Sequence, residues 1–232
     1  MKNWCDIKDS IVTTAIDEEA TWTEIDGTKK VEGDPAMLPD LERYWGAVPG
    51  IDAHDLAVAS ANDTEAWSAA FICYVYNTAG VEKADGFIFG RRHLIYIVGA
   101  LRNRENSDQA KPFWLYDSVE ILLEAAPARG DLICYNRYDK GVYSNHSYSS
   151  LRTLYMNNND VPTGVSHCNI VVAVTERNGN QIIECIGGNL SGSVRYSYLV
   201  IQNGQFMEVD QDGTNPRAEN DIFAIIKNLE CS

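Results

Sequence analysis

The period of the hydrophobic pattern changes near residue 130, and this change leaves few architectures open to the chain. Before it, apolar residues recur at helical spacing, most clearly between a cap at Asp63 or Thr64 and a closing Gly80. After it, short segments rich in β-branched residues alternate with turn signals. Helices followed by an antiparallel meander predict an α+β fold, which we expect to form a single domain over residues 1–232.

The helical half should contain more than the helix that ends at Gly80. Further helices are expected after the cap candidate Asp9, after Pro39, and over residues 91–101 and 116–125. Residues 1–55 would then form a helical extension at the N-terminus.

Two Asn-Gly pairs, at residues 178–179 and 203–204, predict tight β-hairpins. The expected strands cover residues 130–135, 167–175, 181–186, 193–201 and 221–226. Residues 136–162 form a long polar stretch between the first two strands. Long connections of this kind are commonly functional, so this stretch predicts a loop insertion that acts as a lid or as a wall of the substrate cleft.

The formal net charge of −14 and the sequence pI of about 4.6 limit the choice of partner. Nucleic-acid affinity depends largely on neutralising phosphates with Lys and Arg, so a nucleic-acid partner is excluded, and an anionic membrane surface is disfavoured. No apolar stretch reaches membrane-spanning length, and residues 1–6 lack the apolar core of a secretory signal. The chain is therefore expected to be made in the cytoplasm without a signal peptide, and to need a dedicated export route if it acts on a cell wall.

The six cysteines do not suggest a metal site, because no C-x-x-C pair is present. Their density is also too low for a disulfide scaffold in a chain of this length. Most of them are expected to be reduced core residues. The sequence implies no metal and no organic cofactor.

Four short segments carry the candidate catalytic residues. They are residues 67–71 (WSAAF), 127–132 (PARGDL), 166–172 (SHCNIVV) and 184–189 (ECIGGN). Ser68 is expected in the first turn of a helix, beside free backbone N–H groups and the positive end of the helix dipole, which could stabilise an oxyanion. His167, at the start of a strand, could take the Ser68 proton while a side chain on the neighbouring strand orients the imidazole.

The order of these segments resembles the papain-like superfamily, in particular NlpC-type and CHAP-type peptidoglycan hydrolases with a WCAAF…PGD…GHV…GGN pattern. It is also similar to a bacterial family that carries WSAAF at the same place and includes suspected toxins delivered between bacteria. The resemblance covers roughly residues 66–194 and implies a papain-like fold. It assigns the orienting role to Asn189 or to Glu184, and the residues themselves do not decide between the two.

The residue at the cysteine position of the family is Ser68. In the first and preferred explanation Ser68 is a serine nucleophile with His167 as its base. In the second, the nucleophile has moved to Cys134, on the strand expected beside His167. In the third, a laboratory replacement has put serine where the natural protein has cysteine. Cys168 follows His167 directly, so on a strand it should point to the opposite face.

The resemblance implies hydrolysis of a peptidoglycan amide bond, by an endopeptidase or an amidase, with the stem peptide as the ligand. It also implies an antibacterial effector that a secretion system delivers to the periplasm of a target cell, with an immunity protein as its partner. A catalytically inactive binding module is one alternative, which the absence of the usual cysteine favours. Hydrolysis of a peptide or acyl substrate outside the wall is another.

Several other polar residues have a less specific interpretation. His93 could line the cleft, but a solvated position on a helix is expected. Asp131 is expected to be a structural turn residue. Three tyrosines of the polar stretch could contact a glycan or a peptide stem: Tyr143, Tyr148 and Tyr155.

Overall fold

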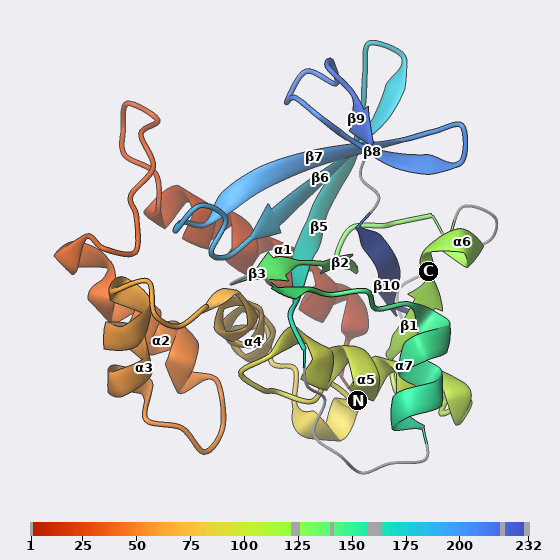
Figure 1. The fold of residues 1–232 in the computed structure, drawn as a ribbon, viewed down its shortest axis with the longest axis horizontal. Helices are drawn as coiled ribbons and strands as arrows, with labels where there is room; N and C mark the ends of the chain where they lie inside the picture. The colour runs from red at the N-terminus through yellow and green to blue at the C-terminus, as the bar shows by residue number, and fades with distance from the viewer. Residues whose placement is uncertain (1, 122–125, 140–141, 157–163, 219–220, 230–232) are drawn as a thin grey trace.

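The computed structural model describes residues 2–121, 126–139, 142–156, 164–218 and 221–229. Its helices are α1 (Trp4–Thr21), α2 (Leu38–Gly46), α3 (Ala53–Ala61), α4 (Ser68–Thr78), α5 (His93–Glu105), α6 (Ser118–Ile121) and α7 (Tyr148–Tyr155), with 3₁₀ turns at Pro35–Met37 and Lys83–Asp85. Its strands are β1 (Phe113–Asp117), β2 (Leu132–Asn136), β3 (Tyr138–Asp139), β4 (Val142–Tyr143), β5 (Ser166–Arg177), β6 (Asn180–Gly187), β7 (Arg195–Gln202), β8 (Gln205–Val209), β9 (Arg217–Ala218) and β10 (Ile222–Asn228). The predicted α+β class is confirmed, with N-terminal helices packed against an antiparallel sheet (Figure 1).

The main sheet has the strand order β1-β10-β2-β5-β6-β7-β8-β9, and each neighbouring pair is antiparallel. The predicted hairpins at the two Asn-Gly pairs are confirmed. Asn178 and Asn203 adopt φ of 53° and 52°, and the glycine after each also has positive φ. This left-handed backbone is the one that a two-residue turn of type I′ requires.

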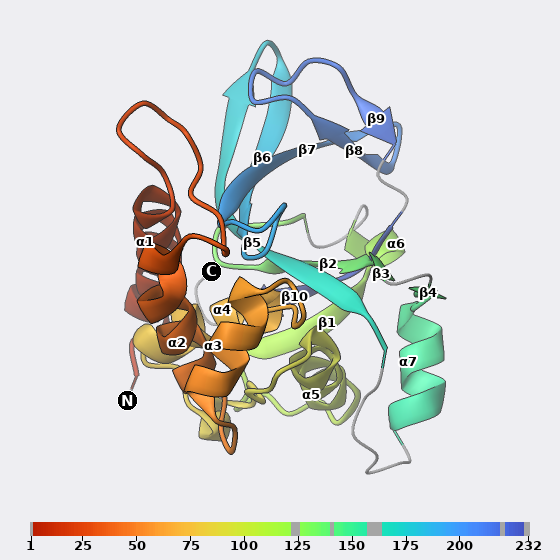
Figure 2. The ribbon, with the colours of Figure 1, turned by 60° about the vertical axis from the view of Figure 1, so that its left-hand side comes forward.

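The two faces of the sheet bury different clusters. The helix-covered face includes Cys168 and Ile170 of β5, which pack with residues of α4 and α5. The other face carries Val171, Phe206 of β8 and Ile225 of β10 in one cluster. Since β8 and β10 lie far apart in the strand order, their contact with one cluster means that the sheet curls, as Figure 2 shows for the strands above the helices.

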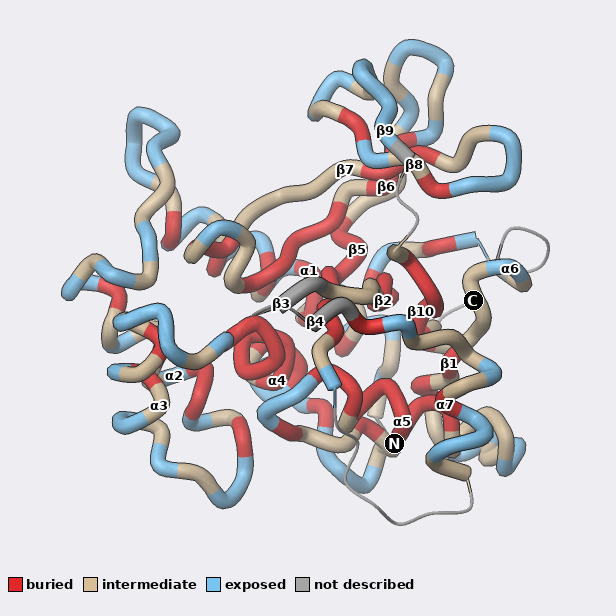
Figure 3. The backbone as a smooth tube through the Cα atoms, in the orientation of Figure 1, coloured by how far each residue is buried: buried red, intermediate tan, exposed pale blue. Residues whose placement is uncertain are grey.

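Burial is concentrated where the helices meet the sheet. Figure 3 shows mostly buried backbone in α4 and α5 and exposed backbone at the hairpin tips beyond β7. Residues 1–55 contribute Ile11, Trp22 and Trp45 to the main core, and all three residues have an exposed fraction of 0%. These N-terminal elements therefore form part of the packing that supports α4.

Two predicted segments differ from the observed structure. The helix predicted over residues 116–125 is confirmed at α6 (residues 118–121) and wrong at residues 116–117, which end β1, while residues 122–125 lie outside the described part. The stretch 136–162, predicted as a loop, contains the β3–β4 pair and α7, which packs on α5. Tyr148, which the sequence suggested as a ligand contact, donates a hydrogen bond to Glu105 of α5 at 2.8 Å. The Tyr143 side chain is outside the described residues.

The cysteines largely follow the prediction. Cys73, Cys134, Cys168 and Cys185 are free and buried, whereas Cys5 is disulfide-bonded. Within the described ranges, no helix combines the length and the apolar character that crossing a bilayer requires.

Candidate functional site

The start of α4 presents Ser68. The helix begins at Ser68 itself, four residues later than the predicted cap Thr64, whose hydroxyl instead donates to the carbonyl of Ala59. Trp67 occupies the N-cap position and supplies no side-chain acceptor, so the first-turn N–H groups of the helix have no capping side chain. Ser68 is only 2% exposed, yet it lines a pocket together with Ala69.

The hydroxyl of Ser68 contacts a histidine, and that histidine is His93. The distance from Ser68 Oγ to His93 Nε2 is 2.7 Å. The other ring nitrogen of His93, Nδ1, forms a hydrogen bond with the hydroxyl of Tyr96. His93 begins α5, and its exposed fraction of 4% shows that the expectation of a solvated position was wrong. The turn of helix that places Tyr96 three residues after His93 also sets their side chains on one face.

His93 is uncharged at neutral pH. Burial, the neighbouring His167 and the Arg137 cation hold its pKa well below the usual range. Tyr96 keeps its proton, because burial and the nearby thiols raise its pKa, and it also has a hydrogen bond to Cys168. If the Tyr96 proton is directed at Cys168, its oxygen accepts Nδ1–H of His93. Nε2 is then the lone-pair nitrogen that faces Ser68.

His167 lies on the concave side of the sheet. Its Nε2 is 2.8 Å from Oδ1 of Asn169, and Asn169 Nδ2 donates to Ser197 Oγ at 3.1 Å. Burial and the Arg137 cation lower the pKa of His167 to about 4. Because the ring is therefore neutral, Nε2–H donates to Asn169 and Nδ1 carries a lone pair, which has no hydrogen-bond partner among the described residues.

The two histidines are neighbours at the edge of the sheet. Their ring centroids are 5.2 Å apart at an interplanar angle of 63°. Along β5 the side chains alternate, so Cys168 faces α4 and α5 while His167 and Asn169 face the other way. The hydrogen bond to Ser68 Oγ that the sequence had predicted for His167 is formed by His93, and the ring of His167 packs against the ring of His93.

In the described structure, neither predicted orienting residue is hydrogen-bonded to His167. Asn189 adopts φ of 56° in the turn after β6 and lines the same pocket as His167, but Asn169 makes the hydrogen bond. Glu184 lies farther along β6, where it accepts a hydrogen bond from Thr175 at 2.8 Å and pairs with Arg177. Asn169 was not predicted from the sequence, although strand alternation places it on the same face of β5 as His167.

Cys134, the second candidate nucleophile, is enclosed in the core. Its exposed fraction is 0%, and its Sγ lies 3.2 Å from Sγ of Cys168, its cross-strand partner. Burial and Cys168 raise the pKa of the Cys134 thiol well above its usual value. A buried thiol with a raised pKa is a poor nucleophile, so these observations do not favour Cys134. Asp131 is structural, as predicted, since it accepts from Lys227 Nζ at 2.6 Å and from Asn228 N at 3.1 Å.

Two pockets meet at this site. The Ser68 pocket has a volume of about 240 Å³ and is lined by Ser68, His93, Arg91, Arg92 and Arg137 among others. The His167 pocket has a volume of about 330 Å³ and is lined by His167, Asn169 and Ser197 on the concave face. Arg137 lines both pockets. It stands at the start of the polar stretch 136–162, for which the sequence predicts a lid or a wall of the substrate cleft.

Gly187 makes the His167 pocket possible. A Cβ atom at this position would lie 1.9 Å from Oδ1 of Asn169 and 3.1 Å from Nε2 of His167. We therefore expect Gly187→Ala to break the His167–Asn169 hydrogen bond, which a shift of the His167 ring signals in NMR spectra would report. Gly46→Ala is the control, because a Cβ there meets nothing within 4 Å. Unchanged His167 signals in Gly187→Ala would contradict this prediction.

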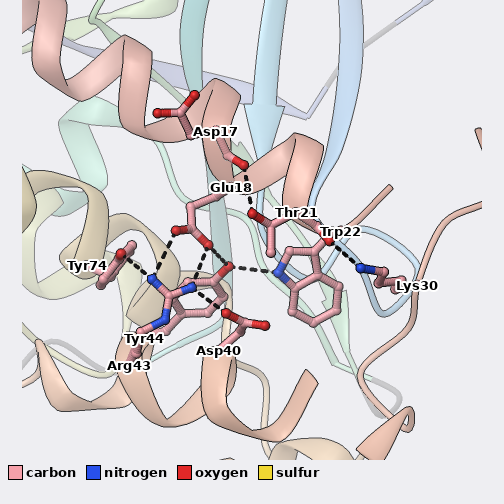
Figure 4. Close-up of polar contacts among 9 residues, drawn as sticks. All are labelled: Asp17, Glu18, Thr21, Trp22, Lys30, Asp40, Arg43, Tyr44 and Tyr74. Atoms are coloured by element: carbon pink, nitrogen blue, oxygen red, sulfur yellow. Dashed lines mark hydrogen bonds and ion pairs between the residues drawn. The ribbon is translucent and has the colours of Figure 1, made fainter. Parts of the chain in front are cut away.

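A buried polar network in α1 and α2 packs against Trp67, at the start of α4. Trp67 stacks on Trp22 with ring centroids 4.9 Å apart, and Trp22 donates to the hydroxyl of Tyr44 at 2.8 Å. Tyr44 in turn donates to Glu18 of α1 at 2.5 Å, and Arg43 donates to the same carboxylate (Figure 4). The network thus joins α1 and α2 to Trp67, the residue directly before Ser68.

Among the described residues, no group of three or more His, Cys, Asp or Glu side chains is arranged to hold a metal ion. The groups closest to Ser68 and His167 are hydroxyl, imidazole, amide and guanidinium groups, and Glu65 is a carboxylate in the lining of the Ser68 pocket. A serine bonded to a neutral imidazole, beside free helix N–H groups, has the components that acyl transfer requires.

No curated protein and no solved structure matches the chain. One bacterial family does match, and it covers residues 17–227, which is most of the chain and includes every residue of the site. The chain belongs to this family, DUF2272, which is described as "uncharacterized protein conserved in bacteria".

Proposed function

We propose that this protein is a serine hydrolase of amide or related acyl bonds, with Ser68 as nucleophile and His93 as general base. The observation that carries the proposal is the 2.7 Å contact between Ser68 Oγ and His93 Nε2 at the start of α4. A hydroxyl depends wholly on a neighbouring base for activation, and a neutral imidazole at hydrogen-bond distance is such a base.

The proposed reaction proceeds in two balanced halves. Ser68 Oγ attacks the carbonyl carbon while His93 Nε2 takes its proton, and the N–H groups of the first turn, such as that of Ala69, stabilise the oxyanion. His93 then gives the proton to the leaving amine, so that the amide C–N bond breaks and an acyl-serine remains. His93 then deprotonates a water molecule, which attacks the acyl carbon. The bond from that carbon to Ser68 Oγ breaks as His93 returns the proton to Oγ, which releases the carboxylic acid and restores the serine hydroxyl and the neutral imidazole. Tyr96 orients the ring of His93.

We propose peptidoglycan as the substrate, through cleavage in the stem peptide or at its junction with the sugar. The support is the resemblance of the WSAAF, SHCNIVV and ECIGGN segments to papain-like NlpC and CHAP enzymes. The α+β fold and the position of Ser68 at a helix start are compatible with a papain-like relationship. The same resemblance supports delivery to a target cell by a secretion system, with an immunity protein as partner.

A second candidate is a binding module without catalytic activity. The low exposure of Ser68 favours it, because a substrate must reach the hydroxyl from a pocket where only 2% of the residue is accessible. Digestion of purified peptidoglycan, with products resolved by chromatography and mass, separates the two. The proteins compared are the unaltered chain, Ser68→Ala, Ser68→Cys and Cys134→Ala.

The expected result is release of fragments by the unaltered chain and by Cys134→Ala, and none by Ser68→Ala. Loss of activity in Cys134→Ala with a preserved fold would instead identify that cysteine as nucleophile. Cutting by Ser68→Cys alone would indicate a cysteine enzyme inactivated by the serine. If none of the four releases a product, either from sacculi or from small acyl substrates, the binding module becomes the better explanation.

A further inference from the structure

The rim of the Ser68 pocket is cationic in a protein that is strongly acidic as a whole. Arg91, Arg92 and Arg137 all line this pocket, although the formal net charge of the chain is −14. Among the described residues of the lining, the one carboxylate is that of Glu65, which is bonded to Arg91 at 3.0 Å. After this pairing, Arg92 and Arg137 leave an excess of positive charge beside the nucleophile.

These two arginines differ from most others in the chain. Ion pairs with carboxylates are formed by Arg43, Arg91, Arg104, Arg129, Arg152, Arg177 and Arg217. Within the part of the chain that the structure describes, neither Arg92 nor Arg137 has a carboxylate at ion-pair distance. The nearby Glu32 interacts electrostatically with Arg137 at a longer range than an ion pair, and its carboxylate accepts a hydrogen bond from the indole of Trp67.

The position of Arg137 is close to the chemistry. Arg137 lines the Ser68 pocket together with His93 and the His167 pocket together with His167, and its charge lowers the pKa of both imidazoles. Arg92 is the residue before His93 and flanks the same pocket from the start of α5. A ligand whose reactive carbonyl lies at Ser68 would therefore have the two guanidinium groups beside it.

We propose that Arg92 and Arg137 bind a free carboxylate of the substrate, so that the site selects acyl compounds that carry a negative charge beside the bond to be cut. This inference rests on the proposed hydrolase and adds the substrate class. Guanidinium groups match carboxylates in planar geometry and donate charge-assisted hydrogen bonds to them. The acidic surface elsewhere repels anions, which confines their binding to this pocket.

A pair of chromogenic esters tests the selectivity. We would measure kcat/KM from nitrophenol release with neutral p-nitrophenyl acetate and with anionic mono-p-nitrophenyl glutarate. The unaltered chain is expected to prefer the anionic ester, and Arg92→Gln and Arg137→Gln are each expected to lower that preference roughly tenfold. The measured quantity is the ratio of the two kcat/KM values, because Arg137→Gln also removes a charge that lowers the pKa of His93. The preference should also fall as salt is added.

Arg217→Gln is the matched control, because Arg217, on β9, is an exposed arginine that forms an ion pair with Asp210. It should leave the preference unchanged. A double variant of Arg92 and Arg137 that retains the full preference for the anionic ester would overturn the proposal.

A binding measurement separates this proposal from the hydrolase proposal. If no ester is cut, calorimetric titration of glutarate into the unaltered chain and into Ser68→Ala decides the matter, with the uncharged diamide glutaramide as reference. Binding of glutarate but not of glutaramide, weakened at least about tenfold by the double replacement, supports the carboxylate site without hydrolysis. Equal binding of the two compounds, or none of either, overturns it.

Discussion

Replacing His93 with glutamine is expected to lower kcat/KM by at least about 10³-fold while leaving the fold intact. Glutamine has nearly the volume of histidine and can still donate a hydrogen bond, but it cannot accept the proton of Ser68. The expected loss follows from the 2.7 Å contact of His93 Nε2 with Ser68 Oγ. His54→Gln is the control, since His54 is exposed on α3 and bonds to Glu42.

The pH profile of the unaltered chain tests the same assignment. Because burial holds the pKa of His93 well below its usual range, its basic form persists as the pH falls. We expect kcat/KM to stay nearly flat from pH 8 to about pH 5.5, where an ordinary histidine is mostly protonated. A profile that declines around pH 6.5 would speak against His93. Full activity of His93→Gln together with an inactive His167→Gln would move the base to His167.

Replacing Glu18 with alanine is expected to lower the free energy of unfolding by about 3 kcal/mol. The carboxylate is 6% exposed and accepts hydrogen bonds from Tyr44 and Arg43. Without it, the buried hydroxyl of Tyr44 has no acceptor for its proton, and the support of Trp67 through Trp22 weakens. Denaturation in urea, followed by tryptophan fluorescence, measures the change.

Asp17→Ala provides the matched control. Asp17 is the preceding residue of α1 and is exposed, and the contact drawn for it in Figure 4 uses its backbone carbonyl. Its replacement should change the stability by less than about 0.5 kcal/mol. Equal destabilisation by Asp17→Ala and Glu18→Ala would mean that the effect comes from the helix in general, and the role of the network would have to be abandoned.

The order of elements could be predicted from sequence because its signals are local. The Asn-Gly pairs at 178–179 and 203–204 determine their turns through backbone conformation, and the alternation in β5 follows from its own residues. The error at β1 has a different origin. Residues 113–117 become a strand by pairing with β10, more than a hundred residues later in the chain, and no local pattern reports such a partner.

The candidate site could be predicted only in part from the sequence, because some of its contacts also join segments that are far apart in the chain. Ser68 stood out because its helix start and its motif coincide, whereas His93 carried one usable signal, the i, i+3 spacing to Tyr96 on a helix. The contact between Ser68 and His93 depends on how α4 and α5 pack against each other. The residue pattern of one helix does not predict which residues of the other helix it will contact. Asn169 could have been found from β-strand alternation, which puts it on the same face as His167.

The group that hydrogen-bonds to Nδ1 of His93 is the neutral phenol of Tyr96. A neutral partner stabilises the charged form of His93 less than a carboxylate would. The contacts of the His93 ring in the described structure are Ser68, Tyr96 and His167, all uncharged, while the nearby Arg137 is positive. The imidazolium that forms when Ser68 loses its proton would therefore lack a counter-ion. The carboxylate of a bound substrate would supply this counter-ion. The site would then be less active toward substrates without a carboxylate, because the charged form of His93 is stabilised only when the substrate's own charge is present.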